Sequence, residues 1–192
     1  PWIVSIGRVM AFFYRDDTPP TVWPVRGQGT NAVPKTGQTT CYNAAGASIS
    51  CAGTGQDGDL KKGIAWPSPR FINNRNGTVT DNLTGLIWLK DADCFGSVSW
   101  TDALSKANQL KSGNCGLSDV STAGQWRLPN MNELHSLVHL GYANPSLSNA
   151  AGTGKWTSGD AFLNVRDYYW SASSHAYFTT LAGVVNLTDG YV

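Results

Sequence analysis

Three histidines are the side chains of this chain best suited to bind a metal ion or to transfer a proton near neutral pH. His135 and His139 stand four residues apart in a segment with helical periodicity, and two imidazoles at this spacing can bind one metal ion. Ser136 follows His135 where the helical metalloprotease motif has its glutamate. We interpret both histidines as half-exposed helix residues beside an apolar stripe, and we predict no metal site.

His175 follows the serine-rich segment 171–174, which raises the question of a serine hydrolase. Such an enzyme needs a nucleophilic serine, typically on a G-x-S-x-G turn, and an acid that orients the histidine. The sequence offers neither pattern. We therefore predict no catalytic residues and expect a protein that is not an enzyme.

Two short acidic pairs could offer oxygen ligands to Ca²⁺, namely Asp57 with Asp59 and Asp91 with Asp93. Neither pair continues into a twelve-residue calcium loop. Exposed turn acids are the favoured interpretation, and a structural calcium ion stays an open hypothesis. No organic cofactor is predicted.

Four cysteines fall into two pairs by proximity along the chain. Cys41 and Cys51 enclose a short hairpin-like segment, whereas Cys94 and Cys115 enclose a helix-sized segment. Neither pair has the close C-x-x-C spacing of zinc or redox sites. We predict the disulfides Cys41–Cys51 and Cys94–Cys115, and hence an extracellular or cell-surface location.

The composition excludes several function classes. Of 192 residues, 14% are charged and 41% are hydrophobic, with a net charge of +1, which fits neither a disordered chain nor a nucleic-acid-binding protein. No stretch approaches the ~20 apolar residues of a membrane span. The apolar segment Trp2–Tyr14 is interrupted by Arg8 and lacks a basic leader, so we expect a mature chain without a signal peptide.

Strands, two helices and further strands are predicted in that order, which is an α+β architecture. The Asn76-Gly77 pair predicts a tight hairpin turn between two of the strands. Strands are expected over residues 70–72, 78–81 and 86–90 and, after the helices, over residues 168–173, 177–179 and 183–187.

Helix starts are predicted at two capping residues, Ser99 and Asn130, each followed three positions later by an acidic residue. The first helix is expected to end near Gly113 and the second at Gly141. Leu134, with other apolar residues at helical spacing, is expected to form the buried stripe of the second helix.

A short strand is predicted just before the second helix, with Trp126 and Leu128 facing the core and Pro129 ending the strand. Arg127 is expected to point the other way. For Arg127 a structural role, binding backbone carbonyls or an aspartate, is favoured over a ligand-binding role.

These segments carry a resemblance to a known family. Residues 78–88, the run from Trp126 to Leu134, and Tyr169-Trp170-Ser171 resemble the DUF1566 family, also called the Lcl C-terminal domain, which ends Legionella collagen-like adhesins. The resemblance covers about residues 33–192. It implies a C-type-lectin-like domain with two helices and short antiparallel strands, related to formylglycine-generating enzymes. The catalytic cysteines of those enzymes have no counterpart here.

The resemblance also implies where a ligand would bind. In C-type-lectin-like relatives recognition lies in the loops after the second helix, a region rich here in polar and aromatic residues. The candidate ligand-binding residues are Trp156, Tyr168, His175 and Tyr177.

The closing strand of the family has a Trp-Pro-Val-Arg-like sequence, which in this chain stands near the N-terminus, at Trp23–Arg26. We therefore predict a strand segment over residues 1–28 that completes the sheet of a neighbouring copy, a linker over 29–34 and the main domain over 35–192. Self-closure as a circular permutation is the alternative. The predicted assembly residues are Trp2, Ile3, Phe12, Phe13, Val22, Trp23 and Val25.

Two functions follow as hypotheses. In the first, the chain is a head-to-tail assembling subunit, or one repeat of a longer polypeptide, in an extracellular surface fibre. In the second, it is a lectin-like adhesin domain that binds glycans. The expected partners are therefore other copies of itself and glycans, with no nucleic acid and no membrane span.

Overall fold

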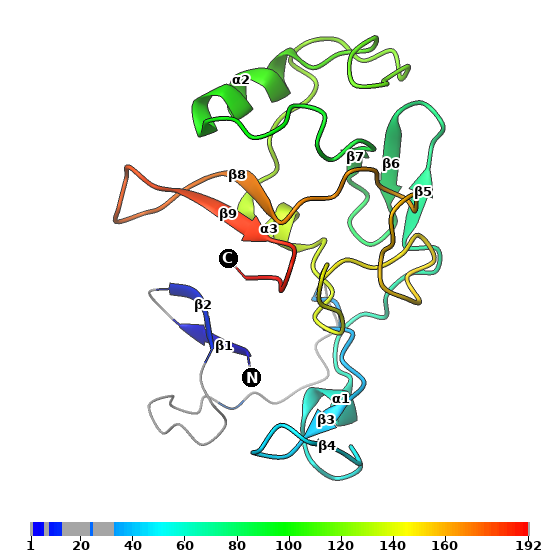
Figure 1. The fold of residues 1–192 in the computed structure, drawn as a ribbon, viewed down its shortest axis with the longest axis vertical. Helices are drawn as coiled ribbons and strands as arrows, with labels where there is room; N and C mark the ends of the chain where they lie inside the picture. The colour runs from blue at the N-terminus through cyan, green and yellow to red at the C-terminus, as the bar shows by residue number, and fades with distance from the viewer. Residues whose placement is uncertain (1, 6–7, 13–23, 25–32, 192) are drawn as a thin grey trace. The chain divides into compact units, whose positions relative to one another are not determined.

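The structure is a computed structural model that describes residues 2–5, 8–12, 24 and 33–191 (Figure 1). The chain divides into two compact units, residues 1–66 with Val192 and residues 67–191. Most of the predicted segment 1–28 and of the predicted linker 29–34 lies outside the described residues. The predicted domain boundaries therefore remain a prediction.

Short antiparallel hairpins form the first unit. β1 (Trp2–Ser5) pairs with β2 (Arg8–Phe12), and β3 (Cys41–Tyr42) pairs with β4 (Ser48–Ile49). A turn closed by the Gly46 N–H on the Asn43 carbonyl joins β3 to β4, as the sequence predicted for this disulfide loop. A one-turn helix, α1 (Asp57–Leu60), follows and was not predicted.

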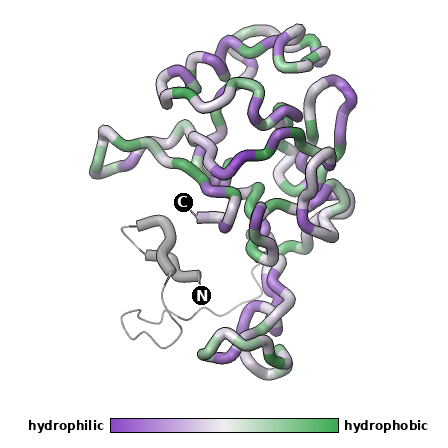
Figure 2. The backbone as a smooth tube through the Cα atoms, viewed as in Figure 1, coloured by the Kyte–Doolittle hydropathy of each residue, from purple (hydrophilic) through white to green (hydrophobic). Residues whose placement is uncertain are grey.

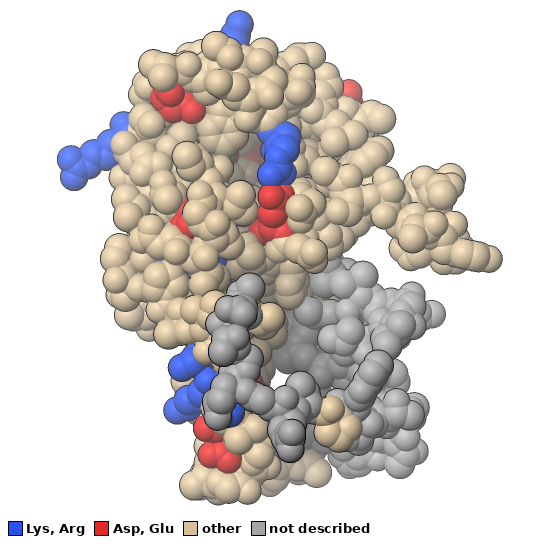
Figure 3. All heavy atoms as spheres, turned by 180° about the vertical axis from the view of Figure 1, so that it is seen from behind, with Lys and Arg blue, Asp and Glu red and all other residues tan. Residues whose placement is uncertain are grey.

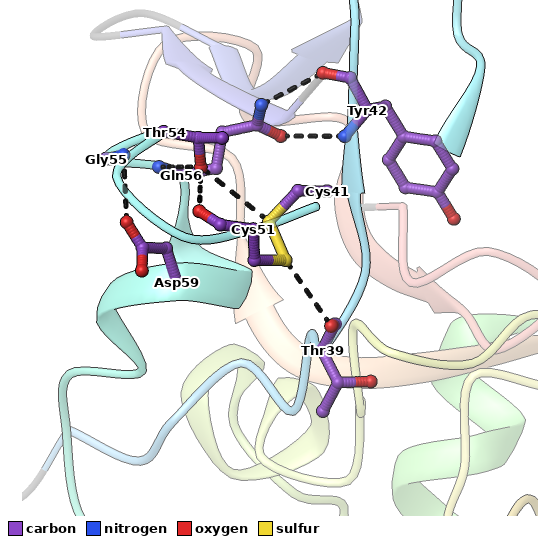
Figure 4. The surroundings of a disulfide bond; sticks show 8 residues. All are labelled: Thr39, Cys41, Tyr42, Cys51, Thr54, Gly55, Gln56 and Asp59. Carbon is purple, nitrogen blue, oxygen red and sulfur yellow. Dashed lines mark hydrogen bonds between the residues drawn. A yellow bond between two sulfur atoms is a disulfide. The ribbon is translucent and has the colours of Figure 1, made fainter. Parts of the chain in front are cut away.

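The Cys41–Cys51 disulfide fixes the β3–β4 hairpin beside α1 (Figure 4). Gly58 is required here because a Cβ atom at this position would lie 2.9 Å from Cys41 Sγ. The Gln56 side chain accepts from the Tyr42 N–H at 3.1 Å and donates to the Tyr42 carbonyl at 2.9 Å. A disulfide and a few polar contacts thus hold a segment that has little apolar core.

In the second unit, β5 (Phe71–Asn73), β6 (Thr78–Asp81) and β7 (Ile87–Leu89) form a three-stranded antiparallel sheet in the order β5-β6-β7. The predicted Asn-Gly turn joins β5 to β6. Gly77 has φ +86°, and a Cβ atom there would lie 2.4 Å from the Gly116 carbonyl oxygen. Only glycine fits both the turn and this close backbone approach.

The predicted first helix is α2 (Trp100–Gln109), and Ser99 is its N-cap, accepting from the Asp102 N–H. Ala103 and Ala107 are the buried residues of this helix. The helix ends at Gln109, before the expected stop near Gly113.

The second helix is shorter than predicted: α3 covers Met131–His135 and does not reach Gly141. Its capping box, formed by Asn130 and Glu133, is present as expected. The chain leaves the helix because Val138 forms a β-bridge with Leu147 instead. His135 and His139 consequently do not lie on one helix face.

A long hairpin, β8 (Tyr168–Ser174) with β9 (Ala182–Asn186), completes the described part of the second unit. The strand predicted at 177–179 is wrong, because this segment is the tight loop of the hairpin. The strand predicted over 126–128 is also wrong, since no described strand pairs with it. Trp126 and Leu128 are nevertheless more buried than Arg127, as their alternation predicted.

The core of the second unit contains residues from the sheets, the helices and the loop before β8, including Phe71, Val79, Leu134, Phe162 and Val185. In Figure 2 the green, hydrophobic stretches of this unit include β9. The protein is a mixed α and β structure with small antiparallel sheets, few helices and two disulfides. No helix among the described residues is long and apolar enough to cross a membrane.

Candidate binding surfaces

A cavity of about 640 Å³ opens in the second unit, within the size range of small-molecule sites. Its wall includes β7 and the loop after it, the inner face of α2, the segment before α3, and the first residues of β8. Figure 3 shows a hollow in the surface of this unit, with basic and acidic side chains next to one another at its edge.

Aromatic side chains line much of this cavity, and polar bonds fix several of them. The Trp170 indole donates to the Val98 carbonyl at 3.0 Å, and the Trp126 indole donates to Ser121 Oγ at 3.0 Å. The Tyr169 hydroxyl accepts from the backbone of the neighbouring loop, and burial raises the pKa of Tyr169 to about 12. These rings are therefore held in place before any ligand binds.

Trp88 differs from the other tryptophans of the cavity. Its indole N–H is buried and has no hydrogen-bond partner among the described residues. A buried donor without an acceptor costs free energy, so this strand keeps one unsatisfied polar group while the residue contributes to the cavity wall.

The charged side chains of the cavity wall are mostly paired. Arg127 binds both carboxylate oxygens of Glu133 at 2.7 Å, and Arg166 binds Asp93 at 2.8 Å. The hydrogen bond from Arg127 holds the pKa of Glu133 below its usual range. With Asp91 the wall carries two arginines and three carboxylates, which disfavours an anionic ligand.

The tip of the β8–β9 hairpin, residues 175–181, is a second exposed apolar feature. Tyr177 is 82% exposed and Phe178 is 56% exposed. The two rings meet edge to face with centroids 4.8 Å apart. The Nδ1 atom of His175 accepts hydrogen bonds from the backbone N–H groups of both residues.

The structure separates the four predicted ligand-binding residues. Tyr168 lines the cavity and is 68% exposed. His175 and Tyr177 lie at the hairpin tip. Trp156 is half-buried, and its indole donates to the Phe162 carbonyl at 3.2 Å.

The acidic pairs have protein partners of their own. Asp57 accepts from the Thr36 hydroxyl and Asp59 from the Gly55 N–H. Asp91 accepts from the Asn164 side chain, while Asp93 binds arginine as described. Among the described residues no group of three or more acidic, histidine or cysteine side chains could hold a metal ion.

Of the two histidines of the predicted second helix, His139 is buried, whereas His135 is only partly buried, closer to the half-exposed position that was predicted. Burial lowers the pKa of His135 and lowers that of His139 to about 4. His139 stacks on Tyr142 with ring centroids 4.2 Å apart, and its Nδ1 accepts from the Gly141 N–H. His139 is therefore a neutral core residue at physiological pH.

Of the predicted assembly residues, Phe13, Val22, Trp23 and Val25 lie outside the described residues, whereas Trp2 and Ile3 are in β1 and Phe12 is in β2. The prediction of strand addition requires a sheet edge without a strand partner. β9 pairs only with β8 among the described strands, so its other edge has no strand partner there.

Sequence reasoning missed the cavity and with it Trp88 and Arg166. Trp88 lies in a strand that was predicted, but a strand pattern does not show which indole will lack an acceptor. Arg127 was expected to bind carbonyls or an aspartate; it does donate to the Leu128 carbonyl, but its carboxylate partner is Glu133 rather than an aspartate. The capping position of Glu133 was the signal that could have placed this carboxylate next to Arg127.

The comparisons with known proteins agree with the resemblance found in the sequence. The model of the family described as the Lcl C-terminal domain matches residues 77–192, which is more than half of the chain. The chain belongs to this family. Among the curated proteins and the solved structures that were searched, nothing matches. Both predicted disulfides are present, which fits an oxidising environment for this Lcl-family chain.

Proposed function

We propose that this Lcl-family chain is a non-enzymatic, extracellular surface protein with a C-type-lectin-like fold, and that the cavity of residues 67–191 binds an uncharged glycan. The observation that carries the proposal is the aromatic lining of this cavity, which includes Trp88 and two tryptophans held by hydrogen bonds, Trp126 and Trp170. Sugar rings present apolar faces that stack on aromatic side chains, and their hydroxyl oxygens accept hydrogen bonds.

The cavity also supports the choice of a neutral ligand. Both arginines of the wall already bind carboxylates, and the wall has one more carboxylate than arginines. A sulfated or carboxylated glycan would therefore meet repulsion rather than a free cation.

A glycan array followed by calorimetry of the strongest neutral binder tests this proposal. Trp88→Leu removes an aromatic ring from the wall, and about fivefold weaker binding is expected from one lost stacking contact. Trp156→Leu is the matched control, because Trp156 does not line the cavity. An array without neutral binders, or equal effects of the two substitutions, would contradict the proposal.

A second function is favoured by the free edge of β9. After β9 the chain turns back, with the Asn186 N–H donating to the Tyr191 carbonyl at 2.7 Å and the Gly190 N–H donating to the Asn186 carbonyl. A strand added along this edge would satisfy its backbone groups. We propose that the segment around Trp23 of another copy supplies that strand, which gives head-to-tail assembly.

Assembly is tested by mass photometry of the purified chain and by a denaturing gel of native material. Subunits joined by strand addition should form ladders that disappear in Val22→Asp/Val25→Asp, whereas Val33→Asp, at an exposed position after that segment, should leave them intact. A single large denatured band in native material would instead indicate tandem repeats in one polypeptide. Monomers at all concentrations would contradict assembly between separate chains.

A further inference from the structure

The tip of the β8–β9 hairpin collects three large, exposed apolar side chains: Tyr177, Phe178 and Leu181, the last 54% exposed. The His175 ring lies 5.2 Å from the Phe178 ring, so the rings form one cluster. Figure 1 shows the hairpin extending away from the rest of the second unit. A clustered apolar group at the end of a projecting hairpin is a recognition feature rather than scattered surface residues.

The backbone under this cluster is hydrogen-bonded within the tip. The N–H groups of Tyr177 and Phe178 donate to His175 Nδ1 at 3.2 and 3.0 Å, and that of Leu181 donates to the Phe178 carbonyl at 2.9 Å. The three residues with exposed apolar side chains therefore need no water for their own N–H groups. In a medium poor in water, an amide N–H without a hydrogen bond costs free energy. The hydrogen-bonded tip avoids this cost and therefore suits such a medium.

The hairpin has no carboxylate, lysine or arginine side chain, and His175 is its one titratable histidine. No Asp, Glu, Lys or Arg occurs between Asp167 and Asp189. In Figure 3 the corresponding arm projects from the second unit without any basic or acidic side chain. Entry of the tip into an apolar phase would thus desolvate no carboxylate, ammonium or guanidinium group.

We propose that residues 175–181 insert into the interface of a lipid bilayer. Tyrosine is enriched at the headgroup level of membranes, where its ring and hydroxyl meet apolar and wet surroundings. Because the hairpin has no lysine or arginine, zwitterionic lipids should suffice and salt should matter little. This site is separate from the cavity, and the proposal goes beyond glycan binding.

Two other occupants fit the tip less well. A stable protein interface buries about 800 Å² on each partner, which is more than a few side chains at a hairpin end supply. A glycan would need several free polar side chains beside the rings, whereas His175 Nδ1 already accepts two hydrogen bonds. A single tip binds a bilayer weakly, and several copies on one surface would add their contributions.

Co-sedimentation of the full chain with phosphatidylcholine vesicles at millimolar lipid tests the proposal. The wild type is expected to bind with less than a twofold change between low and high salt. Phe178→Ser/Leu181→Ser should lower the partition coefficient at least tenfold. Ile72→Thr, an exposed apolar position on β5, and Trp88→Phe in the cavity should each stay within twofold.

Fluorescence gives a second readout. Tyr177→Trp should show a blue shift with vesicles and quenching by brominated lipid, while Tyr168→Trp at the base of the hairpin should show neither. Absence of wild-type binding to phosphatidylcholine, or binding that needs anionic lipid and is lost in salt, would overturn the proposal. So would vesicle binding that survives Phe178→Ser/Leu181→Ser, or a tip-dependent protein or glycan partner without vesicle binding.

Discussion

Two arginine–carboxylate pairs in the second unit have nearly the same geometry and opposite surroundings. Arg70 and Asp81 are fully buried and lie 2.6 Å apart, whereas Arg127 is 62% exposed and lies 2.7 Å from Glu133 beside the cavity. The first pair belongs to the packed region where β5, β6 and the end of α3 meet. The second belongs to the open region that we propose for ligand binding.

In the packed region the Arg70–Asp81 ion pair links several segments of the chain. Asp81 also accepts from the Leu83 N–H and the Thr84 hydroxyl, and Arg70 donates to the Ser136 carbonyl just after α3. The arginine lies 4.7 Å from the centre of the Phe71 ring as well. The open region is less completely packed and hydrogen-bonded, because it contains the cavity and the Trp88 N–H, which has no acceptor among the described residues. The two regions thus differ in solvent exposure: the ion pair of the packed region is buried, whereas the one beside the cavity is exposed.

The largest effect is expected from Asp81→Asn, which leaves the buried Arg70 charge without its counter-ion. Breaking a buried ion pair in this way costs about 3–5 kcal/mol of the free energy of unfolding. Urea unfolding followed by tryptophan fluorescence measures the change. Glu133→Gln, the matched change in the open region, should cost at most about 1 kcal/mol. Equal costs for the two variants would remove the distinction between the regions.

Local patterns in the sequence were enough to predict most elements of the second unit. The Asn76-Gly77 turn, the three strands around it and the capped start of α2 follow from signals within a few residues. The extent of α3 could not be predicted in this way. It ends early because Val138 bridges to Leu147, a contact set by tertiary packing.

The candidate site was also harder to predict from the sequence, because tertiary packing forms it. Tyr168 was predicted as a ligand-binding residue and lines the cavity, but its neighbours there come from segments far apart in the chain. An indole that lacks an acceptor, as in Trp88, is a property of the packed structure and not of a motif. The two disulfides, by contrast, followed from proximity along the chain.

Removing each disulfide should affect a different unit of the chain, because each unit contains one of them. Cys94→Ser/Cys115→Ser removes a link between residues 21 positions apart, which the loop-entropy relation values at about 3 kcal/mol. Because Cys94 lines the cavity, this variant should also weaken ligand binding. Cys41→Ser/Cys51→Ser should destabilise residues 33–66 and leave ligand binding unchanged. Calorimetry and ligand titration of both variants check this, and weaker binding in the second variant would be evidence against it.

A pH dependence is expected from the packed region. His139 has a folded-state pKa of about 4, below the ordinary value of 6.5, because burial disfavours its charged form. The unfolded chain therefore binds this proton first, and the free energy of unfolding should fall by up to ~3 kcal/mol as pH drops from 6.5 to 4. His139→Gln should flatten this part of the urea-midpoint profile. If the urea midpoint of the variant still falls with pH as steeply as that of the wild type, then carboxylates alone cause the pH dependence.

The smallest effect is expected in the open region, from Arg127→Gln. The pair with Glu133 is exposed to solvent, so its loss should cost less than about 1 kcal/mol and less again at high salt. Because Arg127 holds the pKa of Glu133 below its usual range, the pair stabilises the fold at neutral pH and loses this contribution as pH falls through the folded-state pKa. Wild type and Arg127→Gln should thus differ at pH 7 and converge in acid. Unfolding curves at both pH values measure the difference, and a gap that persists in acid would show that Arg127 contributes by packing instead.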